Sequence, residues 1–348
     1  MLGALVAASC LLTGCDLGSR DDEASHGPPL HVLATYPVDG QGVAATADAG
    51  LCDADGGAYG CAIPTNVTAV QLRFDRFLYP LALESGFRLY AGDPDQNSVP
   101  FSAGYDPIER VVSFTLQSPL QPEELYTGEV ILSPQFGSGF WAFDRAPLEA
   151  GSVPLKFVFK TGSGPAPTPP PTTPPVPTQA DSCDTLAGPS STVFSHCAKS
   201  NCHLDIAPPM GLALTDPWHV KHTAISQVAH EADTGEKVGS PLPLSPRFGT
   251  GMPIINPGFP ETSYLLYKVL RRPENYGGCS PSEYGDLPLP NGTCTYASPQ
   301  ELDALHEWFS RGLGMPRDQS EESTNFLSRD QLDRLELWIK NDAPCNTQ

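Results

Sequence analysis

Residues Thr68–Phe74 read Thr-Ala-Val-Gln-Leu-Arg-Phe and carry the clearest strand pattern of the chain. Val70, Leu72 and Phe74 recur at every second position, which is the period that places side chains on one face of a β-strand. The same alternation returns in two further stretches, Val111–Leu116 and Leu155–Phe159. Turn residues separate these short stretches and no long helical pattern interrupts them. We therefore expect an all-β sandwich over residues 30–162.

Length and charge narrow the possible classes of protein. A chain of 348 residues is long enough for about two domains. Its 20 Lys and Arg face 40 Asp and Glu, a formal net charge of −20. Binding to a phosphate backbone needs clustered cations, so a nucleic acid partner is excluded. Ten cysteines favour an oxidising compartment, covalent chemistry at cysteine, or both.

The N-terminus is apolar from Leu2 to Leu12, which is too short to cross a bilayer. The small residues before Cys15 resemble the end of a bacterial lipoprotein signal. This resemblance implies that residues 1–14 are removed, that Cys15 carries the lipid, and that residues 15–29 form a solvated tether. An ordinary secretory signal or a buried helix is the alternative. We expect a lipid-anchored protein of the cell envelope, in the periplasm or on the outer-membrane surface.

A proline-rich segment divides the chain. Eight of the thirteen residues in Pro165–Pro177 are proline. Such a segment favours polyproline II at ~3.1 Å per residue and can span ~40 Å. Residues 163–180 are therefore predicted to be a linker between the sandwich and a second domain over residues 181–348.

The segment Leu120–Val130 reads Leu-Gln-Pro-Glu-Glu-Leu-Tyr-Thr-Gly-Glu-Val and resembles a bacterial Ig-like domain. The resemblance implies that Tyr126 is a tyrosine-corner residue whose hydroxyl bonds back to the backbone. Upstream, Cys52 and Cys61 lie close together in an Asp/Gly-rich insertion, which favours a disulfide that pins a hairpin. A calcium-binding loop at Asp53–Gly56 is the more specific alternative, but the positions where an EF-hand has its later ligands carry no ligand residues.

The segment with the clearest chemistry is Cys197–His203, which reads Cys-Ala-Lys-Ser-Asn-Cys-His. Covalent haem needs two thiols that form thioethers and a histidine placed to ligate iron. The segment resembles bacterial c-type cytochrome domains with Cys-(x)4-Cys-His. Four later segments fit the same pattern in order and spacing: Gly211–Leu214, Pro257–Lys268, Met315–Pro316 and Leu327–Lys340.

That resemblance implies a mainly α, cytochrome c-like domain with one haem c. Helix start signals and apolar spacing agree at three places: Pro260–Leu270, Ser298–Gly312 and Leu327–Lys340, where Ser328 is the N-cap. The predicted fold class is therefore multidomain: an N-terminal Ig-like sandwich, a Pro-rich linker and a mainly α cytochrome c-like domain.

The resemblance also implies the roles of individual residues. Cys197 and Cys202 form the thioethers, His203 is the proximal iron ligand and Met315 the distal one, with Met252 as its alternative. Other candidates for the distal position are Met210, His219, His222 and His230, or the position is open.

Two alternatives to haem follow from the same residues. Cys197 and Cys202 can form a disulfide, or they can bind zinc together with His219 and His222. If haem takes Cys197 and Cys202, six cysteines of the mature chain remain, and they pair plausibly as Cys52–Cys61, Cys279–Cys294 and Cys183–Cys345.

These patterns predict an exported, membrane-anchored c-type cytochrome lipoprotein that exchanges single electrons with an unidentified redox protein. The alternative is a haem-free surface lipoprotein that binds or supports other molecules through its Ig-like domain. A third possibility is a catalytic haem, as in a peroxidase. The sequence has no Gly-x-Ser-x-Gly elbow, Walker loop or His-Glu-x-x-His, so no catalytic residue is assigned.

Overall fold

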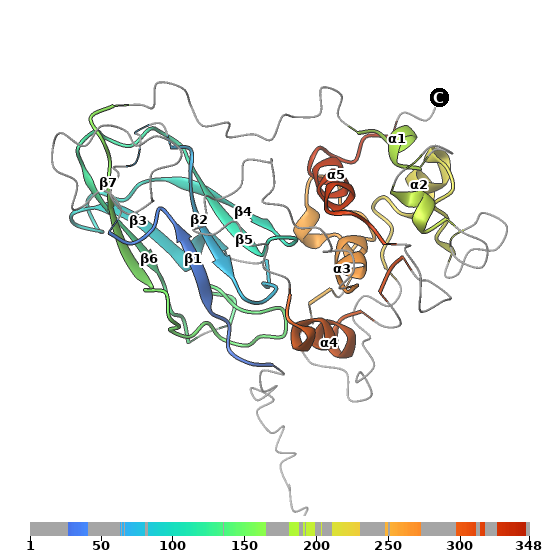
Figure 1. The fold of residues 1–348 in the computed structure, drawn as a ribbon, viewed down its shortest axis with the longest axis horizontal. Coiled ribbons are helices and arrows are strands. Elements are labelled where there is room, and N and C mark those ends of the chain that lie inside the picture. Colours follow the sequence, from blue (N-terminus) through green and yellow to red (C-terminus); the bar gives the residue numbers. More distant parts are fainter. Residues whose placement is uncertain are drawn as a thin grey trace, which may run out of the picture.

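Two antiparallel β-sheets and a layer of short helices make up the described part of the protein (Figure 1). The structure is a computed structural model. It describes residues 27–40, 63, 65, 67–80, 83–134, 136–164, 181–187, 191, 193–198, 203, 211–229, 248–249, 251–272, 297–310, 314–316 and 326–345, without the side chain of Trp308.

The first sheet has four strands in the order β1-β2-β5-β4 and the second has three in the order β3-β6-β7. Their bounds are β1 Val32–Tyr36, β2 Ala69–Phe74, β3 Phe87–Ala91, β4 Phe101–Asp106, β5 Val111–Leu116, β6 Leu125–Val130 and β7 Lys156–Lys160. Every strand pair is antiparallel. The stretches Thr68–Phe74, Val111–Leu116 and Leu155–Phe159 correspond to β2, β5 and β7, as their alternation predicts.

The two sheets pack face to face through aromatic side chains. Phe87 of β3 stacks on Phe114 of β5 with ring centroids 4.3 Å apart, and it also lies 6.1 Å from Phe157 of β7. Phe114 and Phe157 are both fully buried. A Cβ atom at Gly128 would overlap the ring of Phe157, so the core needs a glycine at this position of β6.

Tyr126 makes the bond expected of a tyrosine-corner residue. Its side chain is buried, and its hydroxyl accepts a hydrogen bond from the backbone N–H of Gln121 at 2.8 Å. Because this contact joins β6 to the turn before it, it fixes the entry of the chain into the second sheet. This prediction is confirmed.

The helices are short. They are α1 Cys183–Ala187, α2 Pro217–Thr223, α3 Tyr264–Leu270, α4 Pro299–Trp308 and α5 Arg329–Lys340, with 3-10 turns at Phe194–His196 and Pro260–Thr262. Ser298 caps α4, and Ser328 forms a capping box with Gln331 at the start of α5. The helix expected over Ser298–Gly312 ends at Trp308 in the structure.

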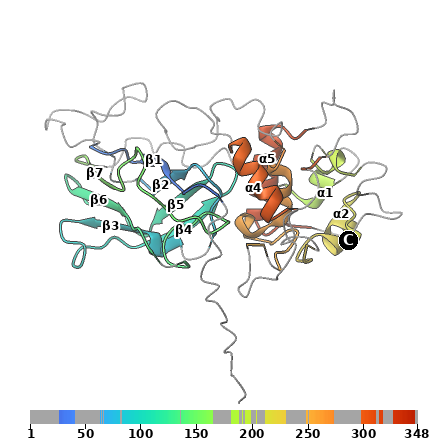
Figure 2. The same cartoon turned by 90° about the horizontal axis from the view of Figure 1, so that it is seen from below.

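The helices lie directly against the β half (Figures 1 and 2). Phe77, Ile108 and Phe143 come from the β half but belong to the buried cluster of the helices. The ring of Phe77 meets that of Tyr267 edge-on at 5.8 Å. In both views α3, α4 and α5 lie next to the sheets, whereas α1 and α2 lie on the far side of the helical layer.

The predicted fold class is therefore wrong. The C-terminal half is not a mainly helical, cytochrome c-like domain held apart from an Ig-like sandwich by its linker. The described part contains seven strands but only five α-helices, which are 5 to 12 residues long. Helices this short bury little apolar surface among themselves. Their buried cluster therefore includes apolar side chains of the β half.

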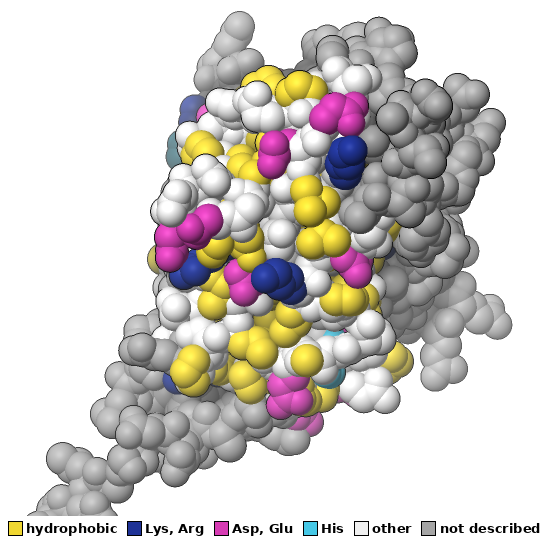
Figure 3. Space-filling view, turned by 90° about the vertical axis from the view of Figure 1, so that its left-hand side faces the viewer, with side chains coloured by type: hydrophobic (Ala, Val, Ile, Leu, Met, Phe, Trp, Pro, Cys, Tyr) yellow, Lys and Arg dark blue, Asp and Glu magenta, His cyan; other side chains and the backbone are white. Residues whose placement is uncertain are grey.

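The outer surface of the β half is mixed. Figure 3 shows acidic, basic and hydrophobic side chains interspersed on the face turned away from the helices. Among the described residues, no helix is both long enough and apolar enough to cross a membrane.

Candidate functional site

Cys197 lies at the end of a tight turn in the helical half. The turn Phe194–His196 precedes it, and the N–H of Cys197 donates to the carbonyl of Phe194 at 2.9 Å. Ser191 caps this turn, because its hydroxyl accepts from the N–H of Val193 at 3.2 Å and from that of Phe194 at 3.1 Å. The side chain of Cys197 is buried, with 5% of its residue surface exposed.

His203 is held beside Cys197 by its backbone. Its N–H donates to the carbonyl of Cys197 at 3.3 Å, and its own carbonyl accepts from the N–H of Leu214 at 3.1 Å. These two bonds place the histidine between the cysteine turn and the segment around Leu214. The structure therefore brings together the first cysteine and the histidine of the sequence motif.

The imidazole of His203 is oriented by a backbone carbonyl. Its Nδ1 lies 2.9 Å from the carbonyl oxygen of Leu212. Since a carbonyl can only accept, Nδ1 carries the proton and Nε2 keeps its lone pair. Burial lowers the pKa of His203, and the positive charge of Lys268 lowers it further, while the bond to Leu212 opposes both. The ring is thus neutral at neutral pH, which is the form that ligates a metal.

Helix α2 fixes the segment that orients His203. The hydroxyl of Thr223 accepts from the N–H of Ala213 at 3.0 Å and donates to the carbonyl of Ala213 at 2.9 Å. Asp216 caps the start of α2 by accepting from the N–H of His219 at 3.0 Å. The sequence pattern includes Leu212 in the step Gly211–Leu214, but it shows neither the role of its carbonyl nor that of Thr223, because a backbone acceptor and its support carry no signal in side-chain type.

Both methionine candidates for the distal ligand belong to the helical core. Met252 is buried, and its backbone bonds to Gly249 at 2.8 Å and to Ala229 at 3.0 Å. Met315 is half-buried at the rim of the same cluster, and its N–H donates to the carbonyl of Lys268 at 3.1 Å. Met315 as the distal ligand, with Met252 as its alternative, stays a prediction.

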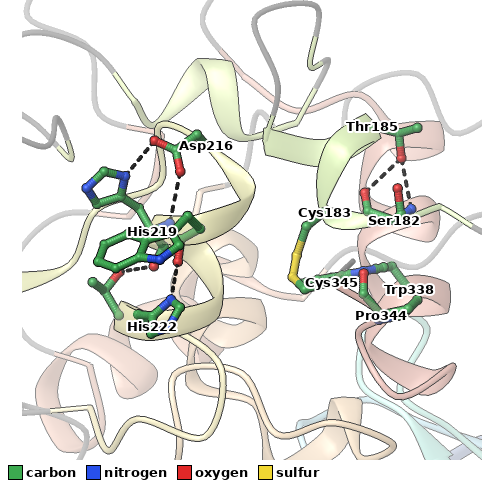
Figure 4. The surroundings of a disulfide bond; sticks show 11 residues. Ser182, Cys183, Thr185, Asp216, His219, His222, Trp338, Pro344 and Cys345 are labelled. Atoms are coloured by element: carbon green, nitrogen blue, oxygen red, sulfur yellow. Dashed lines mark hydrogen bonds and ion pairs between the residues drawn. A yellow bond between two sulfur atoms is a disulfide. The ribbon is translucent and has the colours of Figure 1, made fainter. Parts of the chain in front are cut away.

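The histidines of α2 already have partners on one side of each ring. Nδ1 of His219 lies 2.5 Å from Asp216, and Nδ1 of His222 lies 2.7 Å from the carbonyl of Trp218 (Figure 4). Within the described residues, no three His, Cys, Asp or Glu side chains gather as a metal site. Of the four residues of the zinc alternative, this finding covers Cys197, His219 and His222, since Cys202 lies outside the described residues.

A disulfide between Cys183 and Cys345 fastens the ends of the helical half (Figure 4). The two Cα atoms are 4.9 Å apart across 162 residues of sequence. The N–H of Cys183 donates to the carbonyl of Pro344 at 3.0 Å, and the indole of Trp338 donates to the same carbonyl at 3.3 Å. The bridge joins α1, which precedes the Cys197 turn, to the chain that follows α5.

Several predicted residues lie outside the described part of the chain. They are Cys15, Cys52, Cys61, Cys202, Met210, His230, Cys279 and Cys294, together with the calcium alternative at Asp53–Gly56.

The described part contains residue types that a c-type haem uses as donors, and Cys202 lies outside it. Cys197 is a buried thiol of the apolar cluster, and the backbone of His203, whose imidazole is oriented and neutral, is bonded to it. Met252 and Met315 add two thioethers in the same core. Sulfur, imidazole and thioether in apolar surroundings are the donors that hold a c-type haem.

Comparison with known proteins identifies no family. No family model matches the chain, and no curated protein matches it. Solved structures of the bacterial surface-layer protein SbsC resemble part of it. Its domains 1–6 are 12% identical over 41% of this chain and 15% of that chain, with a TM-score of 0.25. The crystal structure of SbsC residues 31–844 is 13% identical over 40% of this chain and 14% of that chain, with a TM-score of 0.25. The SbsC N-terminal part is 12% identical over 39% and 24%, with a TM-score of 0.23. At these TM-scores the likeness carries no argument about this chain.

Proposed function

We propose that the protein is an exported lipoprotein that carries one covalently attached haem and passes single electrons. The observation that supports this most is the arrangement of His203: its N–H is bonded to the carbonyl of Cys197 and its Nδ1 to that of Leu212. In this arrangement the histidine of the Cys-x4-Cys-His motif is neutral, oriented and next to the first cysteine.

Each residue of the site has a separate task in this proposal. Cys197 and Cys202 would hold the haem through thioethers, and Nε2 of His203 would ligate its iron. The carbonyl of Leu212 keeps the proton on Nδ1, which orients the ring and raises its basicity as a ligand. When bound, the haem supplies a site for one electron.

The distal ligand separates electron transfer from catalysis. A methionine thioether as the second iron ligand would close the iron to substrates and favour its reduced state, which would suit an electron carrier. Met315 is the proposed ligand and Met252 its alternative. A peroxidase would instead need an open position on the iron.

Export and anchoring complete the proposal. The disulfide between Cys183 and Cys345 is typical of proteins in an oxidising compartment. A lipid on Cys15 would hold the protein at a membrane of the cell envelope. Its partner would then be another redox protein of that compartment.

The test is the absorption spectrum of the protein after export together with a haem-attachment machinery. We expect a c-type spectrum with reduced pyridine and low-spin iron. His203→Ala should abolish the low-spin spectrum, whereas His31→Ala, in a histidine of the β half that bonds to Asp75, should leave it unchanged. A colourless protein would refute the proposal and favour a haem-free lipoprotein that acts through its β half.

Two further variants identify the distal ligand. Met315→Ala should convert the iron from low spin to high spin, and Met252→Ala should not. The reverse result assigns the ligand to Met252. High-spin iron in the unaltered protein would contradict electron transfer and favour a catalytic haem.

A further inference from the structure

We propose that Arg76, Asp144 and Glu301 form a proton-operated latch between helix α4 and the β half. The latch holds α4 on the β half when Glu301 is protonated, and it loosens as the pH rises. This inference is independent of the haem. It concerns the junction of the two halves, which the site at Cys197 does not use. The three residues are called the Arg76 cluster below.

The geometry of the Arg76 cluster is that of one cation shared by two acids. Arg76 donates from Nη1 and Nη2 to the two carboxylate oxygens of Asp144 at 3.1 and 2.8 Å. Its Nε donates to Glu301 at 2.7 Å. Arg76, Asp144 and Glu301 are 2%, 6% and 3% exposed. Water therefore does little to screen the charges.

Glu301 is the member that joins the two halves. It lies in the first turn of α4, where its N–H donates to the cap Ser298 at 3.1 Å. Its side chain reaches into the β half, and Oε1 accepts the backbone N–H of Phe77 at 2.8 Å. When this contact opens, the N–H of Phe77 loses its acceptor, and α4 loses its hydrogen bond to the β half at this point.

Charge balance makes this contact sensitive to protons. One guanidinium neutralises one carboxylate, so the second buried carboxylate is costly unless it takes up a proton. Asp144 accepts the bonds from Nη1 and Nη2 of Arg76 and also the N–H of Ala146 at 3.2 Å, whereas Glu301 accepts from Arg76 through Nε alone. Burial raises the pKa of Glu301 to about 7, the charge of Asp144 raises it too, and the bonds from Arg76 and Phe77 oppose the rise.

Other ionisable groups face the same junction. Nearest is Tyr105, whose hydroxyl accepts the N–H of Leu78 at 3.0 Å. Further along the junction, Asp106 and Glu109 of the β half face charged side chains of α5, namely Arg329, Asp333, Glu336 and Lys340. Within the β half, Arg73 bonds to Glu109, and Arg110 lies over the ring of Phe77. Burial raises the pKa of Asp106, Asp333 and Glu336 as well, so these groups act in the same direction as Glu301.

The sign of the effect follows from proton linkage. The closed junction holds a proton on Glu301 up to a higher pH than the open one, so opening releases a proton. Opening therefore becomes easier as the pH rises from the ordinary range of a glutamate towards 7. With the two pKa values at 4.5 and about 7, the opening constant rises roughly twentyfold between about pH 5.5 and 7.5.

The N–H of Phe77 reports on this opening directly, through hydrogen exchange of the full chain. After correction for the intrinsic rate at each pH, we expect its protection to fall roughly twentyfold between about pH 5.5 and 7.5. The N–H groups that join β2 and β5 should keep their protection. Protection of Phe77 that does not change with pH would overturn the proposal.

Two variants assign the effect to Glu301. E301Q leaves Arg76 with Asp144 as its single acidic partner and should flatten most of the pH dependence at Phe77. Asp303→Asn, an exposed acid on the same helix, should keep it. An E301Q protein that retains the full dependence would also overturn the proposal.

A titration needs no variant and decides the matter if E301Q does not fold. The side-chain carboxyl of Glu301, followed by ¹³C NMR in the unaltered protein, should titrate with a midpoint near 7. A midpoint near 4.5 would mean that the carboxylate is ionised throughout the physiological range, and the latch would not exist.

Discussion

Replacement of Phe77 by alanine tests whether the two halves share one core. Phe77 follows β2 and is fully buried. Its ring meets Tyr267 of α3 at 5.8 Å and lies under the guanidinium of Arg110 at 5.8 Å. The side chain therefore belongs to the β half by sequence and to the helical core by contact.

The expected cost is that of a large cavity. A buried phenylalanine replaced by alanine loses about 3–5 kcal/mol of folding free energy, through lost burial and the space left behind. We expect the upper part of this range, since Phe77 has no exposed surface and its contacts come from both sides of the junction.

The assay is hydrogen exchange of α5 together with urea unfolding. Phe77→Ala should lower the protection of Leu335 in α5, far along the sequence but buried in the same cluster. Phe157→Ala is the matched control, since Phe157 is equally buried but lies between the two sheets. If both variants lower the urea midpoint but neither changes α5, the halves are independent and the shared core is refuted.

Three further predictions concern stability. Tyr126→Phe removes the acceptor of the Gln121 N–H and should cost about 1–2 kcal/mol in urea unfolding; an unchanged midpoint would contradict its role. Replacing Cys183 and Cys345 by serine removes a cross-link between residues 162 positions apart and should lower the free energy of unfolding by about 2–5 kcal/mol. Equal stability of the unaltered protein with and without reductant would disprove this. Burial raises the pKa of Glu301 to about 7 and that of Asp333 to about 6, so unfolding releases protons and the urea midpoint should fall between about pH 5 and 7. A midpoint that rises over this interval would show that the sign is wrong.

Local structure could be predicted where the pattern was strong. The alternation in Thr68–Phe74 predicts β2, and the serine at 328 predicts the start of α5, because both signals lie within a few residues of the element. The corner at Tyr126 is also local, since its partner Gln121 is five residues away.

The assembly of the elements could not be predicted in the same way. Arg76 and Glu301 are 225 residues apart, and a sequence pattern does not show that they meet. Phe77 next to a strand looks like a sandwich residue, although its contacts are helical. The predicted separation of the halves failed for this reason, because proline content describes a segment and says nothing of the surfaces that it joins.

The residue types of the site could be predicted from the sequence, but the groups that hold these residues in place could not. Cys197 and His203 are visible in the sequence, because haem attachment needs a thiol and an imidazole in a fixed order. The carbonyl of Leu212, which orients the ring, and Thr223, which fixes that segment, follow from the path of the chain alone.

The most direct test of the central claim is the intact mass of the exported protein after denaturation. The account predicts the mass of the processed, lipid-modified chain plus one haem, retained in denaturant. Replacement of Cys197 and Cys202 by alanine should remove the haem, whereas replacement of Cys183 and Cys345 should leave it attached. A denatured chain without added mass would contradict covalent haem at this site.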